Sequence, residues 1–124
     1  LVGSEMCIRD SCVLSIHQNS YPEEAIHGAQ VFYYEDSSEG KKLAEILQKH
    51  LVEVLDKENH RQAKGNRTYY MLKKTEATLV IVECGFLSNN QEALLLTDEK
   101  YQNKVAKAIC SGTLEYLSSL AEKK

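Results

Sequence analysis

The sequence lacks the features that mark membrane-spanning, nucleic-acid-binding and disulfide-stabilised proteins. No apolar run approaches the roughly 20 residues of a membrane-spanning helix. No cluster of lysine and arginine exceeds two residues, and the net charge of −3 argues against nonspecific binding to nucleic acid. The four cysteines have no CxxC spacing. Repeats, low-complexity tracts and linkers are also absent, so 124 residues with 43% hydrophobic content predict one compact domain.

The apolar segments that are present indicate an α/β protein, in which strands and helices alternate along the chain. Short β-branched and aromatic runs predict strands at residues 12–16, 30–34, 69–72 and 78–83. The polar stretch 56–67 is predicted to be a loop.

Three helices complete the predicted layout. The first follows the capping residues 36–39 and carries one apolar stripe at a 3.6-residue period. The stripe consists of Leu43, Ile46, Leu47, Leu51, Val54 and Leu55. Ser88 and Gln91 resemble a capping box that opens a short helix through Leu96. The last helix is predicted from Thr97 or Asp98 onward.

Two apolar runs end on residues that can carry chemistry. Leu79 to Val82 is followed by Glu83 and a glycine turn, and another run ends on His17. In α/β proteins, catalytic side chains often lie at the carboxyl ends of buried strands. Glutamate and histidine in these positions suggest a metal or acid–base site. The alternatives are a water-exposed strand-end carboxylate and a hydrogen-bonded structural histidine.

Alternation along the last strand separates Glu83 from Cys84. Successive side chains point to opposite faces of a sheet, so both residues should not enter one site. If Glu83 faces the cleft, Cys84 packs behind it, which weakens a hydrolase mechanism with Cys84 as nucleophile. Cys12, Cys84 and Cys110 all lie in apolar contexts, and we expect buried free thiols.

The two strand ends resemble motifs of the zinc-dependent N-acetylmuramoyl-L-alanine amidases of the amidase-3 type. The matching segments are Ser15-Ile16-His17-Gln18-Asn19 and Val82-Glu83-Cys84-Gly85-Phe86-Leu87-Ser88-Asn89. The resemblance continues through residues 28–34 and a C-terminal pattern from Tyr101 to Tyr116, and covers residues 12 to about 118. The sequence around Glu83 and at residues 61–64 is most similar to the spore-cortex, germination-specific branch.

This resemblance implies a fold, a cofactor and a reaction. The fold would be a three-layer α/β domain with a mostly parallel twisted sheet flanked by helices. The reaction would be hydrolysis of the amide between the lactyl group of N-acetylmuramic acid and L-alanine of peptidoglycan, outside the cytoplasm. His17 would be a ligand of Zn²⁺, and Glu83 would be the catalytic residue that relays the proton. No nucleic-acid partner is expected.

Four further residues are candidates for the surroundings of the site. Ser15 shares a strand face with His17 and would support it, or would simply pack its hydroxyl. Asn19 would support the turn after the strand. Arg61 and Lys64 precede the third predicted strand, where family members often have basic residues near the substrate groove. A solvated loop is the alternative for both.

The family pattern has two zinc-ligand motifs that this chain does not show, a GHGG-like histidine and a helix-borne glutamate. We therefore expect residues 12–124 to be the C-terminal part of one catalytic domain, without its N-terminal strand or strands. The segment 1–11 resembles a translated sequencing adapter, and we expect an artefactual or disordered leader. Such a fragment would be inactive, with an uncovered sheet edge that favours aggregation. A non-catalytic cell-wall binding or regulatory module on the same fold is the alternative.

Overall fold

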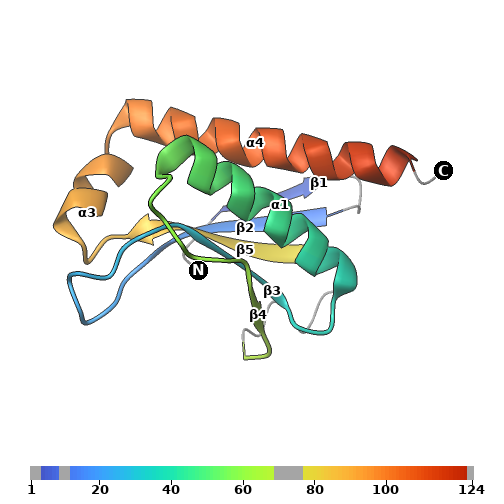
Figure 1. Ribbon diagram of the computed structural model, residues 1–124, viewed down its shortest axis with the longest axis horizontal. Coiled ribbons are helices and arrows are strands. Elements are labelled where there is room, and N and C mark those ends of the chain that lie inside the picture. The colour runs from blue at the N-terminus through green and yellow to red at the C-terminus, as the bar shows by residue number, and fades with distance from the viewer. Residues whose placement is uncertain (1–3, 9–11, 69–76, 123–124) are drawn as a thin grey trace.

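The computed structural model describes residues 4–8, 12–68 and 77–122, which form a five-stranded sheet and three helices (Figure 1). The strands are β1 (Ser4–Ile8), β2 (Cys12–Asn19), β3 (Gln30–Tyr34), β4 (Lys64–Asn66) and β5 (Leu79–Phe86). The helices are α1 (Ser38–Leu55), α3 (Asn90–Leu96) and α4 (Glu99–Glu122). The strand order across the sheet is β1-β2-β5-β3-β4. The predicted strand at residues 69–72 lies outside the described residues.

The α/β class is confirmed, but the sheet is mixed where a mostly parallel one was expected. The pairs β2–β5 and β3–β4 are parallel, whereas β1–β2 and β3–β5 are antiparallel. The reason lies in the connections. Helix α1 links β3 to β4 and allows a parallel crossover, but β2 reaches β3 through a loop with no helix, and β3 runs in the opposite direction.

The two long helices pack side by side on one face of the sheet (Figure 1). The main core lies between them and the sheet. Its fully buried members include Leu14, Val31, Leu43, Leu47, Leu51, Val80, Val82 and Tyr116. A smaller cluster on the opposite face contains Phe32, Leu79 and Ile81. The long helices and the sheet therefore account for two of the three expected layers within the described part of the chain.

Helix α1 begins where the capping residues predicted it. Ser37 is the N-cap, and its hydroxyl accepts a 2.9 Å hydrogen bond from the Gly40 amide. Within the helix, the buried Gln48 accepts a hydrogen bond from the Val31 amide and donates one to the Ala29 carbonyl. These bonds tie α1 to the start of β3, which matters for the site because β3 is a neighbour of β5.

Two local predictions were wrong. Lys64–Asn66 was expected in a loop but forms β4. Its pairing with β3 uses backbone hydrogen bonds, which the polar side chains of this segment do not predict. The N-cap of α3 is Asn89, which accepts a 3.0 Å bond from the Glu92 amide. Ser88 was expected in that role, but its hydroxyl accepts a bond from the Tyr21 amide. Its partner lies far away in sequence, and local pattern did not reveal it.

The leader segment is not disordered throughout, because Ser4–Ile8 pairs antiparallel with β2. Ser4 is opposite Ile16, and Ile8 is opposite Cys12. The edge of β2 is therefore covered, where an open edge was expected. The artefactual origin of residues 1–11 stays a prediction.

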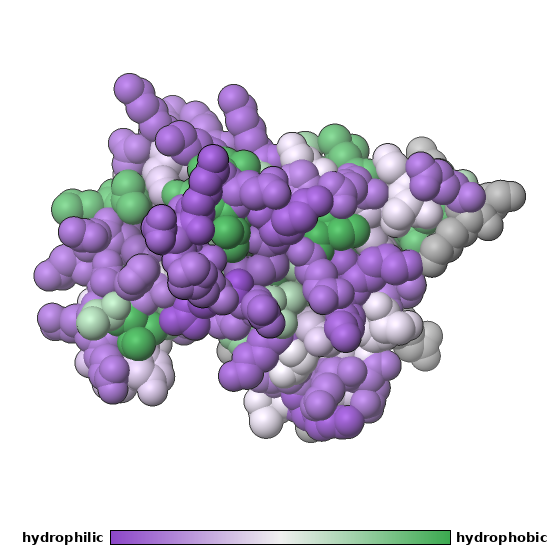
Figure 2. Space-filling model, viewed as in Figure 1, coloured by the Kyte–Doolittle hydropathy of each residue, from purple (hydrophilic) through white to green (hydrophobic). Residues whose placement is uncertain are grey.

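The surface in the view of Figure 2 is largely hydrophilic, with hydrophobic residues in separate patches. The most exposed large apolar side chains are Leu94 on α3, at 73%, and Leu114 on α4, at 59%. Among the described helices, none combines the length and apolar character needed to cross a membrane.

Candidate active site

His17 and Glu83 are direct neighbours across the parallel pair β2–β5. On its other side, Glu83 is paired with Gln30 of β3. Residues opposite each other in a sheet project to the same face, so these three side chains share one face. That face is opposite the one covered by α1 and α4, because the alternating residues Val82 and Cys84 belong to the main core. The structure thus brings together the two residues that the sequence singled out.

Glu83 is buried in a way that a structural carboxylate rarely is. Its residue exposure is 8%, and its Oε2 atom has no hydrogen-bond partner among the described residues. Burial raises the pKa of this carboxyl above its usual range, and the nearby His17 partly opposes the rise. The water-exposed alternative for Glu83 is therefore wrong. A buried, unsatisfied carboxylate costs free energy, which makes it a candidate for function.

We expect that replacing Glu83 with glutamine stabilises this metal-free chain at neutral pH. Because the folded pKa is raised, the protonated carboxyl contributes stability that is present below the unfolded pKa and lost as the pH rises through the folded pKa. A neutral amide of the same shape avoids that loss, which we place at about 1–3 kcal/mol. Urea unfolding at several pH values measures it. The difference between variant and wild type should shrink toward acid pH, and a destabilised variant at neutral pH would contradict the prediction.

His17 is oriented by Ser15, two residues earlier on the same strand. The Ser15 hydroxyl oxygen lies 2.6 Å from His17 Nε2, and Ser15 is 1% exposed. The Nδ1 atom is the ring nitrogen outside this bond. A histidine that binds metal through one ring nitrogen usually forms a hydrogen bond through the other, and the Ser15 hydroxyl is such a partner for His17. The contact is one that a supporting role for Ser15 requires, and that role stays a prediction.

Asn19 supports the turn after β2. Its side-chain Oδ1 accepts a 2.8 Å bond from the Ser20 amide, and its carbonyl accepts one from the Leu87 amide. The register of β2 against β5 shifts between His17 and Asn19. Asn19 therefore connects the end of β2 to the residue that follows β5.

Arg61 is held beside the site, whereas Lys64 is not. The Arg61 Nε atom donates to the His27 carbonyl at 2.9 Å, and Nη1 donates to Gln30 Oε1 at 3.1 Å. Its guanidinium carbon lies 5.1 Å from the centre of the Phe86 ring. Lys64 is exposed on β4 and is opposite Phe32, so the structure does not bring it to Glu83.

Cys84 does not have the environment of a nucleophile. It is 5% exposed and packs in the main core on the helix side of the sheet. Burial raises the pKa of its thiol to about 12, and the charge of Glu83 adds to the rise. A thiol in this state does not ionise near neutral pH, which argues against the cysteine hydrolase. Cys12 is also buried, but Cys110, expected to be buried, is exposed on α4.

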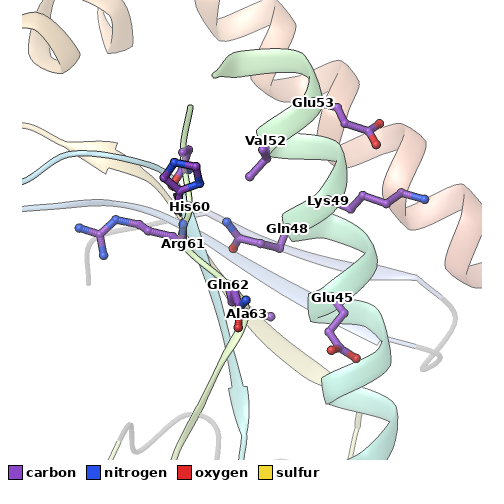
Figure 3. Close-up of a pocket in the computed structure, with 10 residues that line it drawn as sticks. Glu45, Gln48, Lys49, Val52, Glu53, His60, Arg61, Gln62 and Ala63 are labelled. Atoms are coloured by element: carbon purple, nitrogen blue, oxygen red, sulfur yellow. Dashed lines mark hydrogen bonds between the residues drawn. The ribbon is translucent and has the colours of Figure 1, made fainter. Parts of the chain in front are cut away.

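A pocket of about 470 Å³ lies away from His17 and Glu83, between α1 and residues 59–63 (Figure 3). Glu45, Lys49 and Glu53 line it from α1. Neither His17 nor Glu83 lines this pocket. Its walls combine charged and polar side chains with the apolar Val52 and Ala63, and its size alone does not make it a reaction site.

The described residues do not form a complete metal centre. No group of three or more histidine, cysteine, aspartate or glutamate side chains gathers within them. Catalytic zinc requires three protein ligands. His17 offers one nitrogen, and the unpartnered oxygen of Glu83 lies on the neighbouring strand. The described residues therefore fit part of such a site and not the whole.

Two residues that sequence reasoning did not assign to the site also lie beside it. Gln30 is the second neighbour of Glu83, and was noticed only as the start of a strand. Glu92 accepts a hydrogen bond from the amide of Phe86, three residues after Glu83 on β5. The signal for Glu92 was its place three residues after Asn89, the true N-cap.

Comparisons of sequence and of structure with known proteins both find N-acetylmuramoyl-L-alanine amidases. The family model described as N-acetylmuramoyl-L-alanine amidase (Amidase_3) matches residues 8–115. The germination-specific N-acetylmuramoyl-L-alanine amidase of Bacillus subtilis is 39% identical over 105 residues, which are 85% of this chain and 44% of that protein.

Two solved structures are similar to this fold. The CwlD amidase of Clostridioides difficile, determined in complex with the GerS lipoprotein, has a TM-score of 0.85 and 43% identity over 88% of this chain. The catalytic domain of CwlV from Bacillus (Paenibacillus) polymyxa has a TM-score of 0.77 and 31% identity over 87%. The matches cover 55% and 58% of those two chains, so this chain spans about half the length of these three relatives. With its strand-end motifs brought together on one face of the sheet, the chain belongs to the N-acetylmuramoyl-L-alanine amidase family.

Proposed function

We propose that this chain is the C-terminal part of a zinc-dependent amidase domain. It would cleave the amide between the lactyl group of N-acetylmuramic acid and the L-alanine of the stem peptide. The observation that carries the proposal is the buried Glu83, whose Oε2 atom has no partner among the described residues, beside His17 at the ends of two parallel strands. The names of the relatives support the same bond and the same class of substrate.

The role of Glu83 follows from its environment. A general base works best with a pKa near the working pH, and burial raises the pKa of Glu83 in that direction. Glu83 would take a proton from the attacking water and deliver it to the nitrogen of L-alanine. The carbonyl carbon gains a bond to oxygen and loses its bond to nitrogen, and the proton ends on the amine.

His17 would be a metal ligand in this site, held in orientation by Ser15. Bound Zn²⁺ supplies Lewis acidity and a more acidic water in enzymes of this kind. We propose that two further ligands come from residues outside this chain, so that the 124-residue chain by itself binds zinc poorly and is inactive. Arg61 and Gln30, bonded to each other beside Glu83, would border the substrate.

The setting of the reaction would be extracytoplasmic, in the cell wall or the spore cortex. The similarity to a germination-specific amidase favours the cortex. Peptidoglycan is the proposed partner, bound by a monomeric catalytic domain. The structurally similar CwlD amidase was solved with a lipoprotein, which makes a protein partner a second expectation.

The test uses protein expressed from the complete reading frame that contains this chain. We expect incubation with purified peptidoglycan to release new N-terminal L-alanine. A zinc chelator should abolish the release and added Zn²⁺ should restore it, because water activation depends on the metal. Thiol alkylation should have no effect, since Cys84 is buried.

The alternative is a module that binds the cell wall without cutting it. It predicts retention on peptidoglycan with no new N-termini, and no further metal-ligand motif in the reading frame. That result, or activity that resists chelation, would contradict the proposal.

A further inference from the structure

We infer that Glu92 is a positioning residue for Glu83, because its carboxylate joins the turn after β5 to the loop before β3. Oε1 of Glu92 accepts a 2.9 Å hydrogen bond from the Phe86 amide and another of 2.9 Å from the Gly28 amide. The inference rests on the proposed function insofar as Glu83 acts in catalysis. The bonds themselves do not depend on it.

These bonds are not the usual contacts of a residue in the first turn of a helix. In a capping box, the carboxylate returns to the amide of its own N-cap. Here the Glu92 amide does bind the N-cap Asn89, but the side chain reaches out of α3 to two other segments. A carboxylate that accepts backbone N–H bonds makes charge-assisted contacts, which are stronger than bonds between neutral groups.

Two glycines leave room for this carboxylate and for the loop that it holds. A Cβ atom on Gly85 would lie 3.2 Å from the Cδ and both oxygens of Glu92. A Cβ on Gly28, whose φ is +108°, would lie 3.0 Å from Asn59 Oδ1 and 3.1 Å from Arg61 Nε. The backbone therefore approaches side chains closely on both sides of the bridge, as glycine permits.

The bridge connects the end of β5, the strand that carries Glu83, to the loop that leads into β3. Phe86 lies three residues after Glu83 on β5, and Gly28 lies two residues before Gln30, the β3 neighbour of Glu83. Arg61 reinforces the same arrangement, since it binds Gln30 and lies over the Phe86 ring. Glu92 thus fixes the spacing of the strand ends around the reacting carboxylate, and small errors of placement are costly in catalysis.

The test separates geometry from charge with two variants of the full gene product. Glu92→Gln keeps the length and one oxygen acceptor but removes the charge. Glu92→Asp keeps the charge but is too short to reach both amides. We expect E92D to lower kcat by about 10–100-fold with KM nearly unchanged, because misplacement by about 1 Å costs on that order. E92Q should stay within about fivefold of wild type, since both amides keep an acceptor.

Amide hydrogen exchange in the 124-residue chain provides a readout that needs no activity. Exchange at Gly28 and Phe86 should accelerate in E92D and change little in Asn90→Ala, an exposed control on the first residue of α3. The inference is overturned if E92D has wild-type kcat or if E92Q is the worse variant. It is also overturned if those two amides exchange as in wild type. Failure of wild-type protein to cleave peptidoglycan would instead contradict the proposed function, with the exchange result unaffected.

Discussion

Replacing Glu83 with glutamine is expected to lower the rate constant for amide hydrolysis by about 10²–10⁴-fold in the full gene product, the usual contribution of a general acid–base residue. The amide has the same shape as the carboxylate and fills the same buried position. It accepts no proton from water near neutral pH. The loss should appear in kcat, measured as L-alanine N-termini released per enzyme, with the fold and the zinc content retained.

The matched control for this variant is Glu45→Gln. Glu45 is an exposed carboxylate on α1. It lines the pocket between α1 and residues 59–63, which neither His17 nor Glu83 lines. The same chemical change there should leave kcat unaltered. Normal turnover in E83Q would end the assignment of Glu83. A large loss in E45Q would move the reaction to the other pocket, and loss of zinc in E83Q would make Glu83 a metal ligand.

Replacing Leu47 with alanine is expected to lower the free energy of unfolding by about 2–5 kcal/mol, as for other fully buried leucines. Leu47 is 0% exposed and lies on α1 close to Gly112 of α4. A Cβ atom on Gly112 would be 2.9 Å from Leu47 Cδ2. Truncation removes the side chain that fills this approach and leaves a cavity between the helices and the sheet.

Leu94→Ala is the control, because Leu94 is 73% exposed on α3. The same loss of atoms there should change the unfolding free energy by no more than about 0.5 kcal/mol. Urea unfolding of the chain measures both variants. Since domains are stable by about 5–15 kcal/mol, L47A should remove a large share of the total. Equal effects at both positions would mean that α1 does not pack as described.

The combined behaviour of E83Q would be informative beyond either measurement alone. A variant that is more stable and inactive is the expected sign of a residue kept for function at a cost in stability. A structural carboxylate gives the opposite result, because removal of its charge breaks a bond that holds the fold. The raised pKa of Glu83, caused first by burial, predicts the first outcome.

The sequence by itself determined the features that depend on neighbouring residues in the chain, such as helix periodicity, helix capping and the alternation of side chains along a strand. The apolar stripe of α1 follows from the 3.6-residue period except at Val54, which was expected in the stripe but is 44% exposed. The start of the helix within residues 36–39 follows from capping chemistry, and the structure identifies Ser37 as the N-cap. The opposite orientations of Glu83 and Cys84 follow from the alternation of side chains along a strand. The identification of both strand ends rested on residue types at the end of apolar runs, together with the family resemblance.

Tertiary structure decided everything that depends on partners distant in the chain. The antiparallel direction of β3, the pairing of β4 and the coverage of β2 by β1 are matters of strand pairing, which short-range periodicity does not encode. The same reason applies to side chains. Glu92 joins Phe86 to Gly28 and Arg61 joins His27 to Gln30, so their roles follow from contacts that only the folded chain creates.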